Sequence, residues 1–150
     1  MANREYLIQV DQNGYVYAYN QGQAHSVSVQ KARGVTKYDL SKDIQRIQKN
    51  VMVIHNHPSG GNFSGADLIN ASVLKNTTGV VATGSKGATF TFRKGTHFRS
   101  EAFQRGLAKA TLRGQDYTHA VNNWLTANQK RYGYKYTTEG YVNPSRSKKK

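Results

Sequence analysis

A short stretch that combines an apolar run, two histidines, a turn and an acid, residues 51–67, constrains this chain more than any other part of its sequence. It opens with four consecutive apolar residues, Val51–Ile54, and such a run predicts a strand that is buried on both faces. His55 and His57 follow at once. Because side chains on a strand alternate between its two faces, both histidines are expected to point the same way from the strand's end.

The predicted strand should end at a turn that leads directly into a helix. Pro58 cannot continue a hydrogen-bonded ladder, and Gly60 with Gly61 favours a change of direction. Ser64 is a good helix N-cap, and Asp67 stands three residues after it. Asp67 would then lie in the first helical turn, from which its carboxylate can reach back toward the histidines.

These residues supply the donors of a metal site. Two imidazoles and one carboxylate, with a fourth position left for water, form the ligand set of a catalytic zinc site, here His55, His57 and Asp67. The chain has no cysteine, which excludes both disulfides and thiolate zinc sites. A simpler interpretation is that Ser64 and Asp67 only cap a helix and that each histidine is only a polar residue at a strand end. We favour the metal site because all of these features occur together.

The same residues resemble a known family motif. His-x-His-Pro-Ser-Gly followed by Ser-x-x-Asp is similar to the motif of the JAMM (MPN+) metallopeptidases, in the form found in RadC-like proteins and in related domains of phage and bacterial toxin proteins. The resemblance implies that His55, His57 and Asp67 bind zinc and that Ser64 helps to stabilise the tetrahedral intermediate. One departure is that the loop between His57 and Ser64 is one residue shorter than the family's usual spacing.

The resemblance also implies a general base upstream of the motif. In the family this base is a glutamate on an early strand beside the zinc-binding strand, and Glu5 in the Arg-Glu-Tyr opening matches it. Such a carboxylate takes a proton from the attacking water and passes it to the leaving amine. The alternative is that Glu5 is an ordinary exposed acid at a strand end. The similarity is specific over residues 51–69, extends to 4–93 and is weak beyond.

Apolar patterns and turn residues predict the other elements. Strands are expected at 5–10, 15–19, 26–29, 51–54, 79–83 and 88–92, with a hairpin joining the first two. Helices are expected at 39–49, 64–76, 100–113 (capped by Ser100) and 115–131. Together these elements predict an α+β (α/β-like) fold, with a mixed sheet of the JAMM/MPN type flanked by helices and a C-terminal helical hairpin.

The chain has the length of one domain with a modest core. We predict a JAMM-like zinc hydrolase core over residues 1–95, a helical extension packed on it over 96–136, and a basic, disordered tail over 137–150. No apolar run could span a membrane, and the N-terminus lacks a signal-peptide core. A soluble, cytoplasmic protein is therefore expected, with a secreted effector as the alternative. The oligomeric state is not indicated.

The charge balance is strongly positive, with 22 Lys and Arg against 8 Asp and Glu and a net charge of +14. Such a field attracts nucleic acid, an acidic protein or an anionic membrane surface. Near the C-terminus cations alternate with aromatic rings, a pattern that suits stacking on bases beside phosphate contacts. The candidate contacts are Lys130, Arg131, Tyr132, Tyr134, Lys135, Lys148, Lys149 and Lys150. The interpretation that we prefer for 130–136 is a surface strand or arm whose tyrosines pack on the domain.

Three functions fit these features. The leading one is zinc-dependent hydrolysis of a peptide or isopeptide bond, in a peptide or a protein conjugate, by a metal-activated water. The second is a RadC-like nucleic-acid-binding protein whose zinc is structural or acts on phosphodiesters. The third is a phage or toxin effector domain that docks on an acidic partner. Because the family's fold is also used without catalysis, the fold alone does not decide among them.

Overall fold

The computed structural model of the 150-residue chain describes residues 6–10, 16–21, 33–34, 50–57, 61–84, 87–110, 112 and 117–142. For 16–21 and 33–34 it describes the backbone only. Several predictions fall outside these ranges: the strand at 26–29, the helix at 39–49, the general base Glu5, and the tail lysines Lys148, Lys149 and Lys150.

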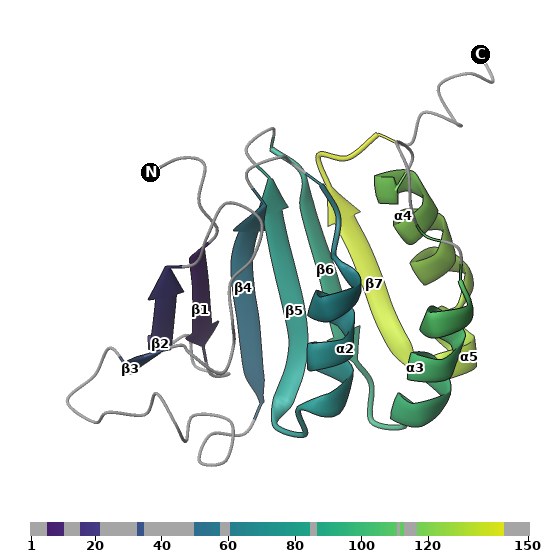
Figure 1. Ribbon diagram of the computed structural model, residues 1–150, viewed down its shortest axis with the longest axis horizontal. Helices are drawn as coiled ribbons and strands as arrows, with labels where there is room; N and C mark the ends of the chain where they lie inside the picture. The colour runs from purple at the N-terminus through teal and green to yellow at the C-terminus, as the bar shows by residue number, and fades with distance from the viewer. Residues whose placement is uncertain are drawn as a thin grey trace.

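The described strands form one mixed sheet of seven, in the order β3-β2-β1-β4-β5-β6-β7 (Figure 1). Their bounds are Tyr6–Val10 (β1), Val16–Gln21 (β2), Arg33–Gly34 (β3), Val51–His57 (β4), Thr77–Gly84 (β5), Thr89–Lys94 (β6) and Tyr134–Glu139 (β7). Among them β4 and β5 pair in parallel, and the other neighbouring strands pair antiparallel. The mixed α+β class is confirmed, whereas a JAMM/MPN topology stays a prediction.

Four helices are described: Gly65–Val73 (α2), Ser100–Lys109 (α3), Tyr117–Ala127 (α4) and Gln129–Tyr132 (α5). The expected single helix over 115–131 is wrong, because the helix breaks at Asn128. The Asn128 backbone N–H and side chain both donate to the Trp124 carbonyl, at 3.2 and 2.8 Å, and the backbone of Asn128 leaves the helical conformation with φ −109° and ψ 13°. The expected cap at Ser100 is also wrong, since its hydroxyl donates instead to the Ser72 carbonyl at 2.7 Å.

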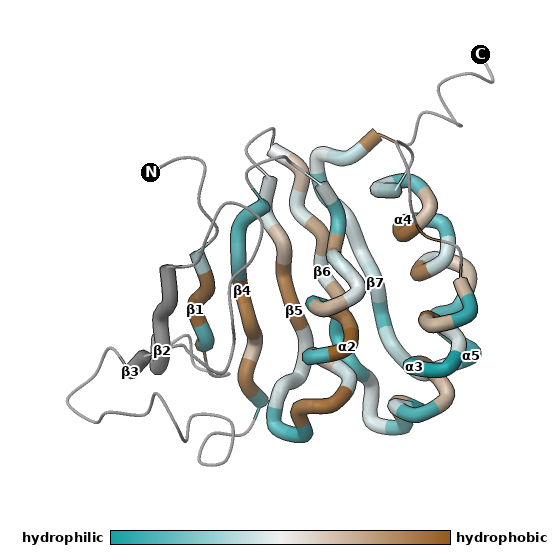
Figure 2. Tube along the Cα trace, viewed as in Figure 1, coloured by the Kyte–Doolittle hydropathy of each residue, from teal (hydrophilic) through white to brown (hydrophobic). Residues whose placement is uncertain are grey.

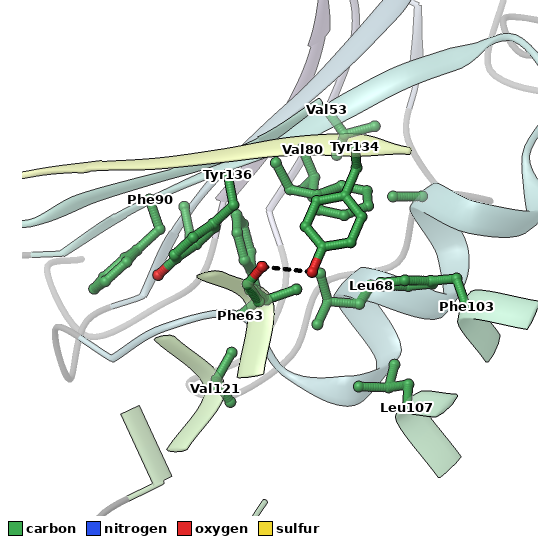
Figure 3. Packing of buried hydrophobic residues seen from close by; sticks show 14 of the residues in the cluster. Val53, Phe63, Leu68, Val80, Phe90, Phe103, Leu107, Val121, Tyr134 and Tyr136 are labelled. Carbon is green, nitrogen blue, oxygen red and sulfur yellow. Dashed lines mark hydrogen bonds between the residues drawn. The ribbon is translucent and has the colours of Figure 1, made fainter. Parts of the chain in front are cut away.

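The described helices lie on one face of the sheet (Figure 1). Side chains of that face pack with the helices in one core, for example Val53 and Val80 from the sheet with Phe103 and Val121 from the helices (Figure 3). Aromatic rings fill its centre, and the Phe92 and Phe103 ring centroids are 5.4 Å apart. Burying such rings contributes about 25 cal/mol per Å² of apolar surface, which makes this face the main source of stability.

Strand β4 is buried on this face and only partly on the other. Val51, Val53, His55 and His57 are buried, whereas the residues between them are intermediate in exposure. Burial on both faces was therefore a wrong expectation, because the described helices cover a single face. None of the helices in the described ranges has the length and apolar character needed to cross a membrane.

The segment after residue 95 belongs to the same core and the same sheet. It supplies three helices where two were expected, and it also supplies β7, which pairs with β6. Tyr134 and Tyr136 on β7 are each 6% exposed. The interpretation that we preferred for 130–136 is therefore right for Tyr134 and Tyr136, which lie on a strand and pack on the domain, and wrong for residues 130–132, which belong to α5.

Candidate metal centre

Strand β4 presents both histidines to the helix-covered face. His55 and His57 are 3% and 8% exposed, and their ring centroids are 4.7 Å apart in an edge-on arrangement. The same-face alternation predicted from the sequence is confirmed. In the sheet, His55 stands between Leu7 of β1 and Ala82 of β5, so the imidazoles project from its central strands.

The start of α2 supplies the carboxylate. Ser64 is the N-cap, and its Oγ accepts a hydrogen bond from the Asp67 backbone N–H at 3.1 Å. The Ser64 backbone N–H in turn donates to Asp67 Oδ2 at 2.8 Å. This reciprocal capping box confirms the predicted cap and fixes the direction of the Asp67 side chain.

Three donor atoms from β4 and α2 converge. His55 Nε2 and His57 Nε2 are 3.0 Å apart, and they lie 3.1 and 3.2 Å from Asp67 Oδ2. Zinc bound tetrahedrally by N and O at about 2.0–2.1 Å separates its donor atoms by about 3.3 Å. The three atoms therefore have the spacing of one face of such a tetrahedron, and the group could hold a metal ion.

The loop after His57 orients that imidazole for metal binding. His57 Nδ1 lies 2.9 Å from the Gly61 carbonyl oxygen. Because a carbonyl only accepts, Nδ1 must carry the proton, and a neutral His57 then offers its Nε2 lone pair. A backbone carbonyl on the second nitrogen is a common support of histidine ligands in metal sites.

The second nitrogen of His55 faces the interior. His55 Nδ1 is buried, and the described residues give it no hydrogen-bond partner. His55 also lines a cavity of about 20 Å³, together with Asp67, Asn70 and Thr77. Apolar side chains line the rest of the cavity, and a space of this size holds about one water molecule. Such a water could accept the Nδ1 proton when Nε2 binds a metal.

The histidines keep Asp67 ionised. Burial would raise the pKa of this carboxyl, but when protons rather than a metal ion occupy the histidine Nε2 atoms, hydrogen bonds and positive charge from His55 and His57 outweigh burial and hold the pKa well below its usual range. The anionic carboxylate is the form that binds a metal ion.

Comparisons of the chain with protein-family models, with curated proteins and with solved structures find no match. Membership of the JAMM family therefore stays a prediction from the motif.

The strand that follows Glu5 lies beside the two histidines. The Tyr6 backbone N–H donates to Asn56 Oδ1 at 2.5 Å, and Leu7 stands opposite His55. The motif resemblance places the general base on an early strand beside the strand of the two histidines, and β1 does pair with β4. Glu5 itself is outside the described ranges, so its role as general base stays a prediction.

The candidate polyanion contacts near the C-terminus separate into two groups. Lys130, Arg131 and Lys135 are exposed. Tyr132 and Tyr134 are 7% and 6% exposed, so their rings cannot stack on bases, contrary to that candidate role. Strand alternation turns Tyr134 into the core, where its hydroxyl donates to the Leu125 carbonyl at 2.5 Å.

Residues far along the chain hold the loop between the histidines and α2. The Asn62 side chain donates to the Tyr136 hydroxyl at 2.9 Å, and the Tyr117 hydroxyl donates to the Phe63 carbonyl at 2.7 Å. Burial and the nearby Asp67 charge raise the pKa of Tyr117, so its hydroxyl keeps its proton. Sequence reasoning missed these residues. The one available signal was that Asn62 follows a glycine pair, as turn residues often do.

Proposed function

We propose that this chain is a zinc-dependent hydrolase of the JAMM type that cleaves a peptide or isopeptide bond. One observation carries the proposal: the Nε2 atoms of His55 and His57 and Oδ2 of Asp67 lie within 3.2 Å of one another on the covered side of β4. The motif resemblance supports the reaction class, and the donor geometry supports the metal.

Zinc at this position would polarise a scissile carbonyl and bring the pKa of its bound water to about 7. The chain's own residues orient the donors. Gly61 sets the tautomer of His57, and Ser64 holds the Asp67 carboxylate through the capping box. The same two-histidine, one-carboxylate set also serves non-haem Fe(II), so the metal must be identified by measurement.

Ser64 has a second role in this proposal. Its Oγ accepts from the Asp67 N–H, and the described residues offer no acceptor for its hydroxyl proton. That proton is free to stabilise negative charge on the carbonyl oxygen of a tetrahedral intermediate. Glu5 would act as general base and deliver a proton to the leaving amine.

Metal analysis of the tag-free protein tests the site. We expect about one zinc per chain by mass spectrometry in the wild type, and loss of zinc in His57→Ala, because two remaining donors bind too weakly. His97→Ala is the matched control, since His97 is exposed and outside the cluster. Stoichiometric zinc in His57→Ala would contradict the ligand assignment.

Hydrolysis assays on peptides and ubiquitin-like conjugates test the reaction. Glu5→Gln should retain zinc and lose turnover, because the amide cannot take the proton. Unchanged turnover would show that another group is the base. A zinc-loaded wild type that cleaves none of these substrates would count against the hydrolase proposal.

A further inference from the structure

A second concave surface lies on the helical side of the molecule. This cationic groove, about 570 Å³ in volume, runs between α3 and the end of α4 with α5. Four cations line it: Arg99, Arg105, Lys109 and Arg131. None of the metal-centre residues lines it, and α5 lies toward the opposite end of the sheet from the C-terminal end of β4 (Figure 1).

The spacing of residues on α3 builds the groove. Ala102, Gly106 and Ala110 line it at intervals of four, so these small residues form its floor along one side of the helix. Arg105 and Lys109 stand one turn apart, about 6 Å along the axis, and form a cationic wall. Figure 2 shows that α5 is hydrophilic and that α3 alternates hydrophilic with hydrophobic residues.

Among the described residues, no acid lines the groove to neutralise these cations. Glu101 lies 4.0 Å from Arg105, but both side chains are largely exposed, so the pair is weak. One guanidinium nitrogen of Arg99 donates to the Arg131 backbone carbonyl. Because that carbonyl is uncharged, the bond does not neutralise the positive charge of Arg99. A concentration of like charge in a concave site attracts a polyanion.

An aromatic ring completes the groove. Trp124 lines it and is partly exposed. Its other contacts hold the ring in place, since it stacks on Tyr132 at 6.0 Å between centroids and packs on Phe103 at 5.6 Å. A rigid indole beside guanidinium groups is a typical platform for a nucleobase. Arginine forks also match phosphate geometry.

We propose that the cationic groove binds single-stranded nucleic acid, with phosphates on the four cations and a base stacked on Trp124. The indole favours a nucleic acid over an acidic protein, because carboxylates offer nothing to stack on it. The concave shape disfavours a flat membrane surface. The proposal uses none of the metal ligands, so it stands or fails independently of the hydrolase.

Intrinsic fluorescence reports directly on the groove, because Trp124 is the only tryptophan of the chain. Titration of the full-length protein with an unstructured oligodeoxythymidylate should quench or shift its emission as the ligand binds. Poly-glutamate of equal charge should bind more weakly and leave the emission unchanged. Binding of the oligonucleotide with no change at Trp124 would overturn the proposal, as would equal binding and quenching by poly-glutamate.

Charge variants locate the binding site. Arg105→Gln/Lys109→Gln should weaken oligonucleotide affinity about tenfold or more and reduce the slope of log K against log salt by about 1.4, at about 0.7 per phosphate contact. Lys75→Gln/Arg93→Gln is the matched control: it removes the same charge from two exposed residues that do not line the groove. Equal losses of affinity and slope in both double variants would overturn the groove assignment.

Discussion

Asp67 combines a structural and a chemical role in a single atom. Its Oδ2 accepts the Ser64 backbone N–H and also lies within 3.2 Å of both histidine Nε2 atoms. Because the cap fixes the carboxylate before any metal binds, little side-chain entropy remains to be lost on binding. The interpretation of Ser64 and Asp67 as a helix cap and their interpretation as parts of a metal site are therefore compatible.

Gly106 shows how one missing side chain shapes the helical face. A Cβ at this position would clash with the Tyr132 hydroxyl, whereas a Cβ at Gly65 would meet no atom within 4 Å. Tyr132 is buried and cannot move aside freely. Close packing of α3 on α5 thus depends on this glycine.

We predict that Gly106→Ala lowers the free energy of unfolding by about 1–3 kcal/mol, the usual cost of overpacking. Gly65→Ala is the control, and its better helix propensity should raise stability by up to about 1 kcal/mol. Urea denaturation of both variants measures the difference. Equal stability of the two would show that the Tyr132 contact imposes no constraint.

At the scale of elements, the start of α2 links helix stability to metal binding. Ser64→Ala removes the side-chain cap and should cost about 1 kcal/mol of stability. It should also weaken zinc affinity severalfold, because the first helical turn that carries Asp67 loosens, although the Ser64 backbone N–H that holds the carboxylate remains. Zinc titration against a competing chelator measures this effect.

Ser100→Ala is the matched control for that prediction. It removes a hydroxyl that bonds the Ser72 carbonyl at 2.7 Å, and it lies outside the metal cluster. A stability loss of about 1 kcal/mol is expected here too, with zinc affinity unchanged. If both serine variants weaken zinc equally, the effect comes from general destabilisation and not from the cap.

The elements after residue 95 complete the site. The hydroxyls of Tyr136 and Tyr117, on β7 and α4, hold Asn62 and Phe63 in the loop before α2. The metal loop is therefore braced by residues more than 50 positions away in sequence. A hydrolase core limited to residues 1–95 would lack these contacts.

For the molecule as a whole, buried tyrosines couple stability to alkaline pH. Burial raises the pKa of Tyr134 and Tyr136 above the ordinary value of 10.0. Above that pH the unfolded chain loses phenolic protons that the folded chain retains, so the unfolded state binds fewer protons and stability falls as pH rises. Well below pH 10 both the folded and the unfolded chain keep these phenolic protons, so the two tyrosines do not make stability depend on pH there.

We predict that the free energy of unfolding falls above about pH 10 by up to about 1.4 kcal/mol per pH unit for each such tyrosine. Tyr136→Phe should show a shallower fall, although it is less stable at neutral pH because it loses bonds to Asn62 and Asn122. Urea denaturation at a series of pH values compares the slopes. If the free energy of unfolding falls equally steeply with pH in the variant and the wild type, Tyr136 does not contribute to this pH dependence.

Local rules acting over a few residues were enough to predict the centre of the candidate site. Strand alternation predicted that His55 and His57 share a face, and capping preferences predicted Ser64 and Asp67 at the start of α2. Turn residues predicted the hairpin of β1 and β2, whose antiparallel pairing is confirmed. These predictions hold because each depends on neighbours in sequence and not on distant contacts.

What the sequence by itself determined is therefore the donor set, its order on β4 and α2, the α+β class and the positive charge. The tertiary structure decided that the donors meet within 3.2 Å, that Tyr132 and Tyr134 are buried, and that four cations and Trp124 line one groove. These outcomes depend on packing between residues far apart in the chain. Periodicity carries no information about such contacts, because it records which face of an element is apolar but not which other element covers it.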